Sequence, residues 1–470
     1  MKSLFYSLAL FTMTQLILTG QLKAQSLTTL HAFANGLDGA NPWGGLVLAG
    51  NTLYGTAYTG GTQASGIIFS INTNGSDFAD IHDFTSGDDG ANPYAGLILS
   101  GTTLYGTANT GGSTGNGTVF SVGLDGLNFK TIHGFAGGSD GANPWGGVVL
   151  SSGTLYGTTK LGGSGSGTVF AVSTDGTTFK TLHSFSGSDG ALPIGGLVLA
   201  GGILYGTTQQ GGAFGNGTVF AINVNGSGFT NLHSFAATSG NNLVNDDGAN
   251  PWAGLIIAGN TLFGTAYSGG SYGFGTVFAL NTEGSGFQTL HAFTAPAGSE
   301  GINRDGAFPI AGLILSGKTL YGAAQAGGDW GSGTVFSLTT NGADFVTLYN
   351  FSPITSLNSP NTDGAYPNAG LILPDVTLYG TTYTGGAVGY GSVFSLPVPV
   401  APPQLTISPA QGGVVLTWPT NVTGFTLQSA TNLDAPAFWS AVSPGPVVVA
   451  GLNTVTNPIS GTQHFYRLSK

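Results

Sequence analysis

The sequence predicts an all-β protein: a seven-bladed β-propeller closed by an N-terminal strand and followed by a small β-sandwich domain. Three observations predict this fold. One motif recurs seven times, each complete copy contains four strand-like runs, and the two ends of the array are permuted. The motif contains Leu-Tyr-Gly-Thr or a close variant. This segment begins at Leu53, Leu104, Leu155, Leu204, Leu262, Leu320 and Leu378. Because successive copies are 51, 51, 49, 58, 58 and 58 residues apart, the chain is expected to be a solenoid or a propeller.

The first element is an N-terminal leader. Residues 1–24 combine the basic Lys2, a largely apolar stretch and the small residue Ala24 at the end, which is typical of a secretory signal peptide. No later segment has the roughly 18 consecutive apolar residues that a membrane span needs. We therefore expect a secreted protein, extracellular or at the cell surface, without a membrane span in the mature chain.

The propeller is predicted over residues 25–397. In the fifth copy, short apolar runs at 253–258, 261–266, 275–281 and 286–293 are separated by turns that contain Gly and Asn. Runs bounded in this way are strand signals. Four strands in a unit of ~50 residues match the size of one propeller blade.

The ends of the array favour a closed ring over an open solenoid. The seventh copy stops after its third strand, and the missing Thr-Leu-His-x-Phe strand is found at residues 29–33, ahead of the first full copy. Exchange of this strand would close the circle. It would also remove the exposed sheet edges that promote aggregation.

A proline-rich linker at 398–403 and an immunoglobulin- or fibronectin-like β-sandwich at 404–470 complete the chain. The linker reads Val-Pro-Val-Ala-Pro-Pro, and such sequences are stiff and extended. The tail leaves the repeat and carries strand-like runs of its own. Trp418 and Trp439 are expected in its core.

Composition excludes several classes of partner and cofactor. The chain has 20 acidic and 9 basic residues, with a formal net charge of −11. We therefore expect no binding to nucleic acid, because phosphate contacts require a basic face. The absence of cysteine excludes disulfides, iron–sulfur clusters and thiolate zinc sites. We expect no cofactor, and we expect a monomer.

The repeat also carries a family resemblance. With Leu-Tyr-Gly-Thr, Gly-Gly and Gly-Thr-Val-Phe at this spacing in seven copies, the chain resembles the GloVer tandem-repeat family of exported bacterial proteins. The tail is similar to the short C-terminal sandwich modules of secreted bacterial proteins. The resemblance implies an extracellular, often surface-associated protein, and it brings no established catalytic residues.

Two sets of repeated polar residues are interpreted as scaffold. Six histidines share one position of the fourth strand, where each is expected to be hydrogen-bonded at a blade edge. Seven aspartates precede Gly-Ala, where each is expected to accept backbone N–H groups in a tight turn. Residues repeated around a ring lie too far apart to share a metal ion, and one carboxylate per turn is too few for calcium. No metal site and no catalytic residue is therefore assigned, although a single ion held by backbone carbonyls in the channel stays open. The residues are His31, His82, His133, His183, His233 and His291, with Asp38, Asp89, Asp140, Asp189, Asp247, Asp305 and Asp363.

The residues that depart from the repeat form the candidate binding site. The connection before Asp-Gly-Ala lengthens in the last three copies, and the loop inside Gly-Gly…Gly-Thr becomes aromatic in the later copies. Both connections emerge on the same face of a blade, so they are expected to meet in blades four to seven. Aromatic side chains on loops of a rigid scaffold are a common binding arrangement, and packing of these rings against one another is the alternative. The candidate ligand-binding residues are Phe214, Tyr272, Phe274, Trp330, Tyr390 and Trp252.

Trp252 also belongs to a second aromatic set, which follows the proline of the Asp-Gly-Ala-x-Pro turn. Its position at the entry to the innermost strand favours packing between blades near the channel. The members of this set are Trp43, Tyr94, Trp145 and Trp252.

These observations favour a non-catalytic recognition module that binds an extracellular glycan or protein through aromatic loops on one face. One alternative is a polysaccharide-active hydrolase or lyase on a propeller scaffold. A glycosidase needs two carboxylates about 5–9.5 Å apart, and the non-repeated acids of the favoured face, Asp246, Glu300 and Asp329, form no recognisable motif. A second alternative is a structural surface or matrix protein.

Overall fold

The computed structural model describes residues 26–240, 243–295, 302–399, 404–410, 413–420, 425–432, 438–458 and 464–469. The chain divides into two compact units, Met1–Val398 and Pro399–Lys470. The expected signal peptide and residues 400–403 of the expected linker lie outside the described residues. Within the described part of the chain, no helix is long and apolar enough to cross a membrane.

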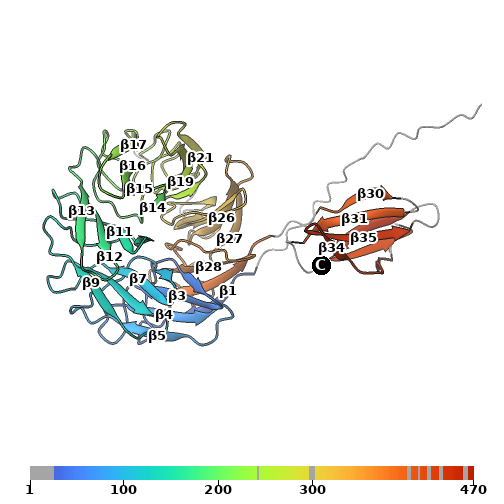
Figure 1. Cartoon of the computed structure of the whole chain (residues 1–470), viewed down its shortest axis with the longest axis horizontal. Coiled ribbons are helices and arrows are strands. Elements are labelled where there is room, and N and C mark those ends of the chain that lie inside the picture. The colour runs from blue at the N-terminus through green and yellow to red at the C-terminus, as the bar shows by residue number, and fades with distance from the viewer. Residues whose placement is uncertain are drawn as a thin grey trace, which may run out of the picture. The chain divides into compact units, whose positions relative to one another are not determined.

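The larger unit is a propeller-like array of antiparallel sheets arranged around a common centre (Figure 1). Five of its sheets each contain four strands that pair in chain order. The first sheet is β2 (Val47–Ala49), β3 (Thr52–Ala57), β4 (Ile67–Asn72) and β5 (Ala79–Asp83); the second is β6 (Ile98–Ser100), β7 (Thr103–Ala108), β8 (Thr118–Gly123) and β9 (Lys130–Gly134); the third is β10 (Val149–Ser151), β11 (Thr154–Thr159), β12 (Thr168–Ser173) and β13 (Phe179–Ser184). The fourth is β14 (Val198–Ala200), β15 (Ile203–Thr208), β16 (Thr218–Asn223) and β17 (Thr230–Ser234); the fifth is β18 (Ile256–Ala258), β19 (Thr261–Ala266), β20 (Thr276–Asn281) and β21 (Gln288–Ala292).

The sixth and seventh sheets depart from this pattern. The sixth is β23 (Ile314–Ser316), β24 (Thr319–Ala324), β26 (Thr334–Thr339) and β27 (Val346–Asn350), and a separate two-stranded sheet pairs β22 (Asn303–Ala307) with β25 (Ala326–Gly328). The seventh is β28 (Thr377–Thr382), β29 (Ser392–Pro397) and β1 (Thr28–Ala32), in the order β1-β29-β28. Thr28 lies opposite Ser395 and Ala32 opposite Ser392. The first strand of the chain therefore supplies the outer strand of the last sheet.

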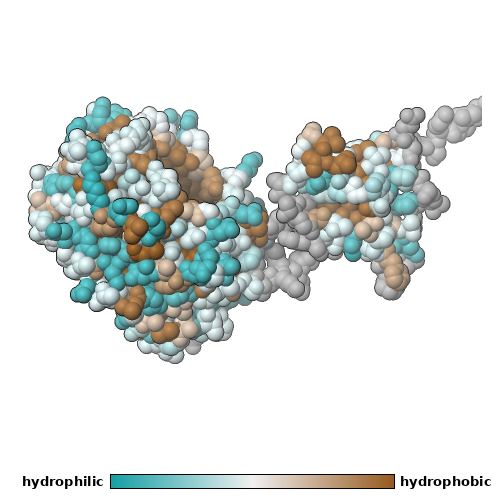
Figure 2. All heavy atoms as spheres, turned by 60° about the horizontal axis from the view of Figure 1, so that its bottom comes forward, coloured by the Kyte–Doolittle hydropathy of each residue, from teal (hydrophilic) through white to brown (hydrophobic). Residues whose placement is uncertain are grey.

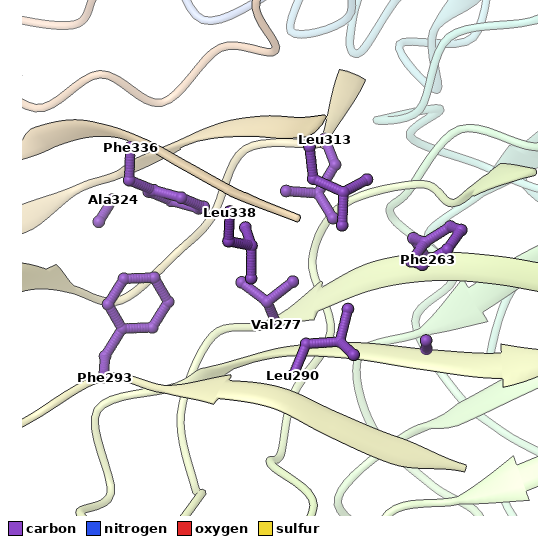
Figure 3. Close-up of a cluster of buried hydrophobic side chains, with 10 residues drawn as sticks. Phe263, Val277, Leu290, Phe293, Leu313, Ala324, Phe336 and Leu338 are labelled. Atoms are coloured by element: carbon purple, nitrogen blue, oxygen red, sulfur yellow. The ribbon is translucent and has the colours of Figure 1, made fainter. Parts of the chain in front are cut away.

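The hydrophobic core of this unit lies between neighbouring sheets. Because each sheet is covered on both faces, its central strands are apolar on both sides, as in the almost fully buried β20 and β26. Figure 3 shows one such layer, where side chains of the fifth and sixth sheets point toward each other. The labelled residues of this layer are Phe263, Val277, Leu290 and Phe293 of the fifth sheet with Leu313, Ala324, Phe336 and Leu338 of the sixth.

The glycine of Leu-Tyr-Gly-Thr makes room for a phenylalanine ring. A Cβ atom added to Gly206 would lie 2.6 Å from Cζ of Phe220 and 2.8 Å from Cδ2 of Leu197. Contacts this short force the neighbours to move. Glycine is therefore required here by packing, not by its own backbone conformation.

A repeated hydrogen bond joins the inner ends of successive sheets. The threonine of Leu-Tyr-Gly-Thr donates through Oγ1 to a backbone carbonyl of the following sheet: Thr56 to Ala95, Thr107 to Gly146, Thr158 to Gly195, Thr207 to Ala253 and Thr265 to Ala311, over 2.8–3.2 Å. In the sixth sheet Ala323 occupies the position, and in the seventh the buried Oγ1 of Thr381 has no partner. The pattern is thus interrupted on both sides of the seventh sheet.

The smaller unit contains two antiparallel sheets. One is β30 (Thr406–Ala410), β31 (Gly413–Pro419), β35 (Leu452–Pro458) and β34 (Val447–Val449); the other is β33 (Ser440–Ala441), β32 (Thr426–Ala430) and β36 (Phe465–Ser469). Trp418, 2% exposed, packs with Leu416, Leu427 and Val455 in their common core. Trp439, also expected in the core, is only half-buried, and the guanidinium of Arg467 lies 4.3 Å from its ring centroid.

Candidate functional site

The repeated histidines and aspartates of the larger unit form pairs. Nε2 of each histidine lies 2.8–3.3 Å from Oδ2 of the aspartate that follows it in the chain. Because an ionised carboxylate can only accept, Nε2 carries the proton and donates in five of these pairs. Nε2 of His82 lies 3.3 Å from Asp89 but makes no hydrogen bond. In the sixth sheet the hydroxyl of Tyr349 replaces the histidine and donates to Asp363 at 2.6 Å. The same aspartates also accept backbone N–H groups, as Asp38 does from Ala34 at 3.0 Å.

Sequence reasoning treated these two sets separately and missed their pairing. The signal was a nearly constant separation of 7, 7 and 6 residues in His31–Asp38, His133–Asp140 and His183–Asp189. The longer loops stretch it to 14 residues in the fourth and fifth sheets. Among the described residues, no group of three or more histidines and acids could hold a metal ion.

Each histidine also stacks on a phenylalanine of the following sheet, with ring centroids 3.7–4.0 Å apart and nearly parallel planes. One side chain therefore ties a turn of its own sheet to the core of the next. This double role explains why the residue recurs, and it requires no ligand.

The three long loops are anchored by an asparagine that has no counterpart in the short ones. Oδ1 of Asn245 accepts from the N–H groups of Gly248 and Gly270, at 2.9 and 2.7 Å. In the short loop of the first sheet, the backbone carbonyl of Gly36 performs this task for Gly39 and Gly61. Asn303 and Asn361 make the equivalent bonds in the other two long loops. The side-chain amide thus substitutes for a backbone carbonyl, which lets the loop lengthen without loss of the turn.

The predicted binding residues lie in three different settings. Phe214, Tyr272 and Trp330 are on loops and are 58%, 47% and 58% exposed. Trp252 and Phe274 are half-buried and line one pocket. Tyr390 packs against the core between the seventh and first sheets.

The aromatic set after the proline continues into a longer inner aromatic chain. Rings make successive contacts from Tyr383 through Trp43, Tyr94, Trp145, Trp252 and Tyr267 to Phe308, with centroids 4.3–5.8 Å apart. Tyr94 and Trp145 are stacked at 4.3 Å. The inner aromatic chain runs through the seventh, first, second, third, fifth and sixth sheets and so follows the centre of the array.

Two pockets open beside this chain. The Trp252 pocket, of about 470 Å³, is lined by Gln209, Gln210, Leu243, Asn250, Trp252, Tyr267, Ser268, Gly273, Phe274 and Phe308. The Asn368 pocket, of about 510 Å³, is lined by Trp43, Tyr267, Phe308, Gln325, Ala326, Leu357, Tyr366, Asn368 and Tyr383. Both sizes fall in the range of ~300–1,000 Å³ that small-ligand sites occupy. In Figure 2, hydrophobic residues gather around a hollow in the larger unit.

Each pocket contains a buried hydrogen-bond donor without a partner: Nε1 of Trp252 in one and Nδ2 of Asn368 in the other. Nearly all buried polar groups in proteins are paired, so an unpaired donor at a pocket indicates an absent acceptor. The sequence pattern points to Trp252 but gives no role to Asn368, which occupies the equivalent position in the seventh copy.

The pocket linings carry no formal charge. None of their described lining residues is Asp, Glu, Lys, Arg or His. Burial raises the pKa of Tyr267 and of Tyr383, whose hydroxyls therefore stay protonated at neutral pH. The cation close to the inner aromatic chain is Lys160, whose Nζ lies 4.2 Å from the ring centroid of Trp145 and whose pKa is lowered by burial.

A family model described as Gloeobacter/Verrucomicrobia repeat matches three overlapping stretches, residues 10–164, 124–245 and 241–406. No curated protein matches the chain.

Several solved structures resemble this chain at low identity. A nidogen/laminin complex is 16% identical over 60% of this chain and 90% of that one, with a TM-score of 0.37. An oligogalacturonate lyase from Vibrio parahaemolyticus is 12% identical over 80% and 94%, with a TM-score of 0.48. The tricorn protease is 13% identical over 81% and 34%, with a TM-score of 0.40.

Proposed function

The chain belongs to the Gloeobacter/Verrucomicrobia repeat family, and from this premise we propose that it is a secreted recognition protein that binds an extracellular glycan at the Trp252 pocket. The observation that carries the proposal is the unpaired Nε1 donor of Trp252 in a pocket walled by aromatic rings. Flat rings match the apolar faces of sugar rings, and sugar oxygens are the acceptors that this donor lacks.

The rest of the lining supports the same ligand class. Gln209 and Gln210 border the pocket, and each of these amides offers both donors and an acceptor. Such groups pair with hydroxyls, which also donate and accept. The amide of Asn250, which also lines the pocket, is already paired with the carbonyl of Gln209 and the hydroxyl of Ser268.

The proposal extends to the architecture. We propose a seven-bladed β-propeller over residues 25–397, closed by pairing of the N-terminal strand with the last sheet. The linker at 398–403 and an immunoglobulin- or fibronectin-like sandwich at 404–470 would follow it. In this proposal the protein is a monomer, located outside the cell or at its surface, with the smaller unit as a separate module.

Binding is preferred over hydrolysis because of what borders the pocket. Asp246 lines a different pocket, of about 430 Å³, and Asp329 is exposed, where it accepts a bond from Asn350. Glu300 lies outside the described residues. No described carboxylate lines the Trp252 pocket, so a pair at glycosidase spacing is not part of this proposal.

The test is a glycan array with the full chain, followed by calorimetric titration of the best ligand. Trp252→Ala and Phe274→Ala should each weaken binding by roughly ten-fold or more. Phe438→Ala is the matched control: this aromatic residue is 89% exposed in the smaller unit, so its loss should leave affinity unchanged. A triple variant, Phe214→Ala with Tyr272→Ala and Trp330→Ala, tests whether the exposed aromatic rings of the loops contribute to glycan affinity. Loss of binding in this triple variant with full binding in Trp252→Ala would move the site to the loop tips.

A further inference from the structure

We propose that the Asn368 pocket is a second subsite of the same groove, and that the groove takes a neutral, linear oligosaccharide that extends from one pocket to the other. The inference rests on the proposed function, whose site it enlarges. The two pockets are neighbours, because Tyr267 and Phe308 line both. Between them, the pockets draw lining residues from the fourth, fifth, sixth, seventh and first sheets.

The repeat is broken at this subsite in a specific way. The residue before the proline adopts positive φ in every copy, and in four sheets it is asparagine: Asn41, Asn92, Asn143 and Asn250, with φ of 55–57°. Each of these asparagines donates through Nδ2 to a backbone carbonyl of the preceding sheet, over 2.8–3.1 Å. Asparagine is well suited to this left-handed conformation.

Phe308 and Tyr366 take the same conformation, with φ of 58° and 57°. Bulky residues rarely do so, because the side chain crowds the backbone. The replacement also removes the Nδ2 donor to the preceding sheet. Backbone strain of this kind is characteristic of functional sites, and here both rings line the Asn368 pocket. Leu192 makes the same substitution in the fourth sheet but lines neither pocket, so it supplies a control.

Gly370, at the junction between the sixth and seventh sheets, has open space beside it, as has its counterpart Gly312 in the sixth sheet, where an added Cβ atom would find its nearest neighbour at 3.9 Å. A Cβ atom added to Gly370 would meet nothing within 4 Å, whereas one added to Gly254, at the equivalent place in the fifth sheet, would lie 2.5 Å from a backbone oxygen. Ala323 supplies no hydroxyl to bridge this junction, as the threonines of earlier sheets do.

Asn368 marks the polar end of the subsite. Its side chain is 4% exposed, its Oδ1 accepts from Nε2 of Gln325 at 3.1 Å, and its Nδ2 has no partner. A ligand in the pocket can supply an acceptor for this Nδ2 group. An oxygen of a second sugar unit would accept from Asn368, as an oxygen of the first would accept from Nε1 of Trp252.

Charge selects the class of sugar. Neither pocket is lined by a charged side chain, and the chain as a whole carries a net charge of −11. An anionic polysaccharide would find no cationic side chain lining either pocket, and the net negative charge of the protein would repel it. A neutral oligosaccharide needs no cationic partner and is not repelled.

The experiment titrates the full chain with cellobiose through cellohexaose, the matching xylan, mannan and laminarin series, and anionic alginate oligomers. For at least one neutral series, the longest member should bind about ten-fold tighter than the disaccharide. Tyr366→Asn and Asn368→Leu should each remove this gain and leave disaccharide affinity unchanged. Tyr366→Asn should also melt higher than the parent, since it restores the repeated hydrogen bond. Asn368→Leu removes the unpaired donor together with the hydrogen bond from Gln325, so its melting temperature should stay close to that of the parent.

A higher melting temperature with weaker binding cannot come from unfolding. Leu192→Asn should raise the melting temperature in the same way and leave affinity for every member of the series unaltered.

Affinity independent of chain length, or Tyr366→Asn with full affinity for the longest member, overturns the second subsite and leaves the proposal for the Trp252 pocket unaffected. Tighter binding of alginate than of any neutral series overturns neutrality. No binding to any sugar, here or on the array, overturns the proposed function as well.

Discussion

The repeated histidine links two sheets through one ring. His183 donates from Nε2 to Asp189 at 2.8 Å and stacks on Phe229 at 3.7 Å. Where the phenylalanine is missing, the histidine is missing too. The position of Phe229 is occupied by Leu27 in the seventh sheet, and Tyr349 stands in for histidine on the sixth sheet that precedes it. Both residues are thus replaced at the interface between the sixth and seventh sheets. This joint replacement indicates that the histidine is retained for its stacking partner as much as for the carboxylate.

This chemistry predicts a loss of stability in mild acid. Burial lowers the pKa of His31, His82 and His133 below the usual 6.5, and the neighbouring aspartates raise it by less. Since the folded pKa lies below the unfolded one, the unfolded chain binds more protons as the pH falls through 6.5. The stabilisation is therefore fully present above about pH 6.5 and declines below it.

The free energy of unfolding, measured by denaturant titration at about pH 7.5 and about pH 5.5, should be lower at the acid value. A variant with glutamine at all three positions keeps a donor without a titrating ring, so it should be less stable at neutral pH and show a smaller difference between the two pH values. An identical difference in parent and variant would show that other groups are responsible.

At the scale of elements, the outermost strand completes the edge of each sheet, and in the three-stranded seventh sheet that strand is β1. It pairs with β29 from Thr28 to Ala32, while Leu30 and Phe33 pack into the core shared with the first sheet. The strand thus completes a sheet and covers an interface at once. An unpaired β29 would expose backbone donors and acceptors that recruit other strands.

A chain that starts at Ala34 should therefore lose several kcal/mol of a total that is only ~5–15 kcal/mol, or aggregate. The measurement is thermal unfolding of the shortened and full chains at matched concentration, with light scattering to detect aggregation. A synthetic peptide of residues 26–33, added in excess, should restore part of the lost stability. A shortened chain that melts as cooperatively and at the same temperature as the parent would rule out this role for β1.

At the scale of the whole molecule, the two units are internally complete. Every sheet of the larger unit finds its partners within residues 28–397, and every sheet of the smaller unit within 406–469. Their cores are likewise built from their own residues, with Val398 the last contributor to the larger unit and Leu405 the first to the smaller.

We therefore expect a chain ending at Val398 to fold unaided and to melt within a few degrees of the corresponding transition of the full chain. Differential scanning calorimetry of both chains provides the comparison. The full chain should show the same transition with a second, smaller one from residues 404–470. An insoluble shortened chain, next to a soluble full one, would place the boundary elsewhere or make the larger unit dependent on the smaller.

The repeated antiparallel sheets could be predicted from the sequence, with four strands in six of them, because turn glycines and apolar alternation are local signals that seven copies reinforce. The seventh sheet has three strands instead of the expected four, and the pairing of β22 with β25 was not expected. The sequence by itself also determined the placement of the N-terminal strand in the last sheet, since that follows from one strand missing at one end and present at the other. The loop aromatics were visible as departures from the repeat.

Which of these residues lie in contact follows from the packing of the sheets and not from the sequence pattern. The pairing of His233 with Asp247 and the inner aromatic chain join residues of different loops or sheets, and their proximity depends on sheet packing that no local pattern encodes. The Asn368 pocket is the clearest case. Asn368 reads as an ordinary polar replacement until the open junction beside Gly370 and the rings of Phe308 and Tyr366 surround it. The unpaired amide of Asn368 indicates a ligand only because it is buried. Its burial depends on the packing of neighbouring sheets, which the sequence pattern does not show.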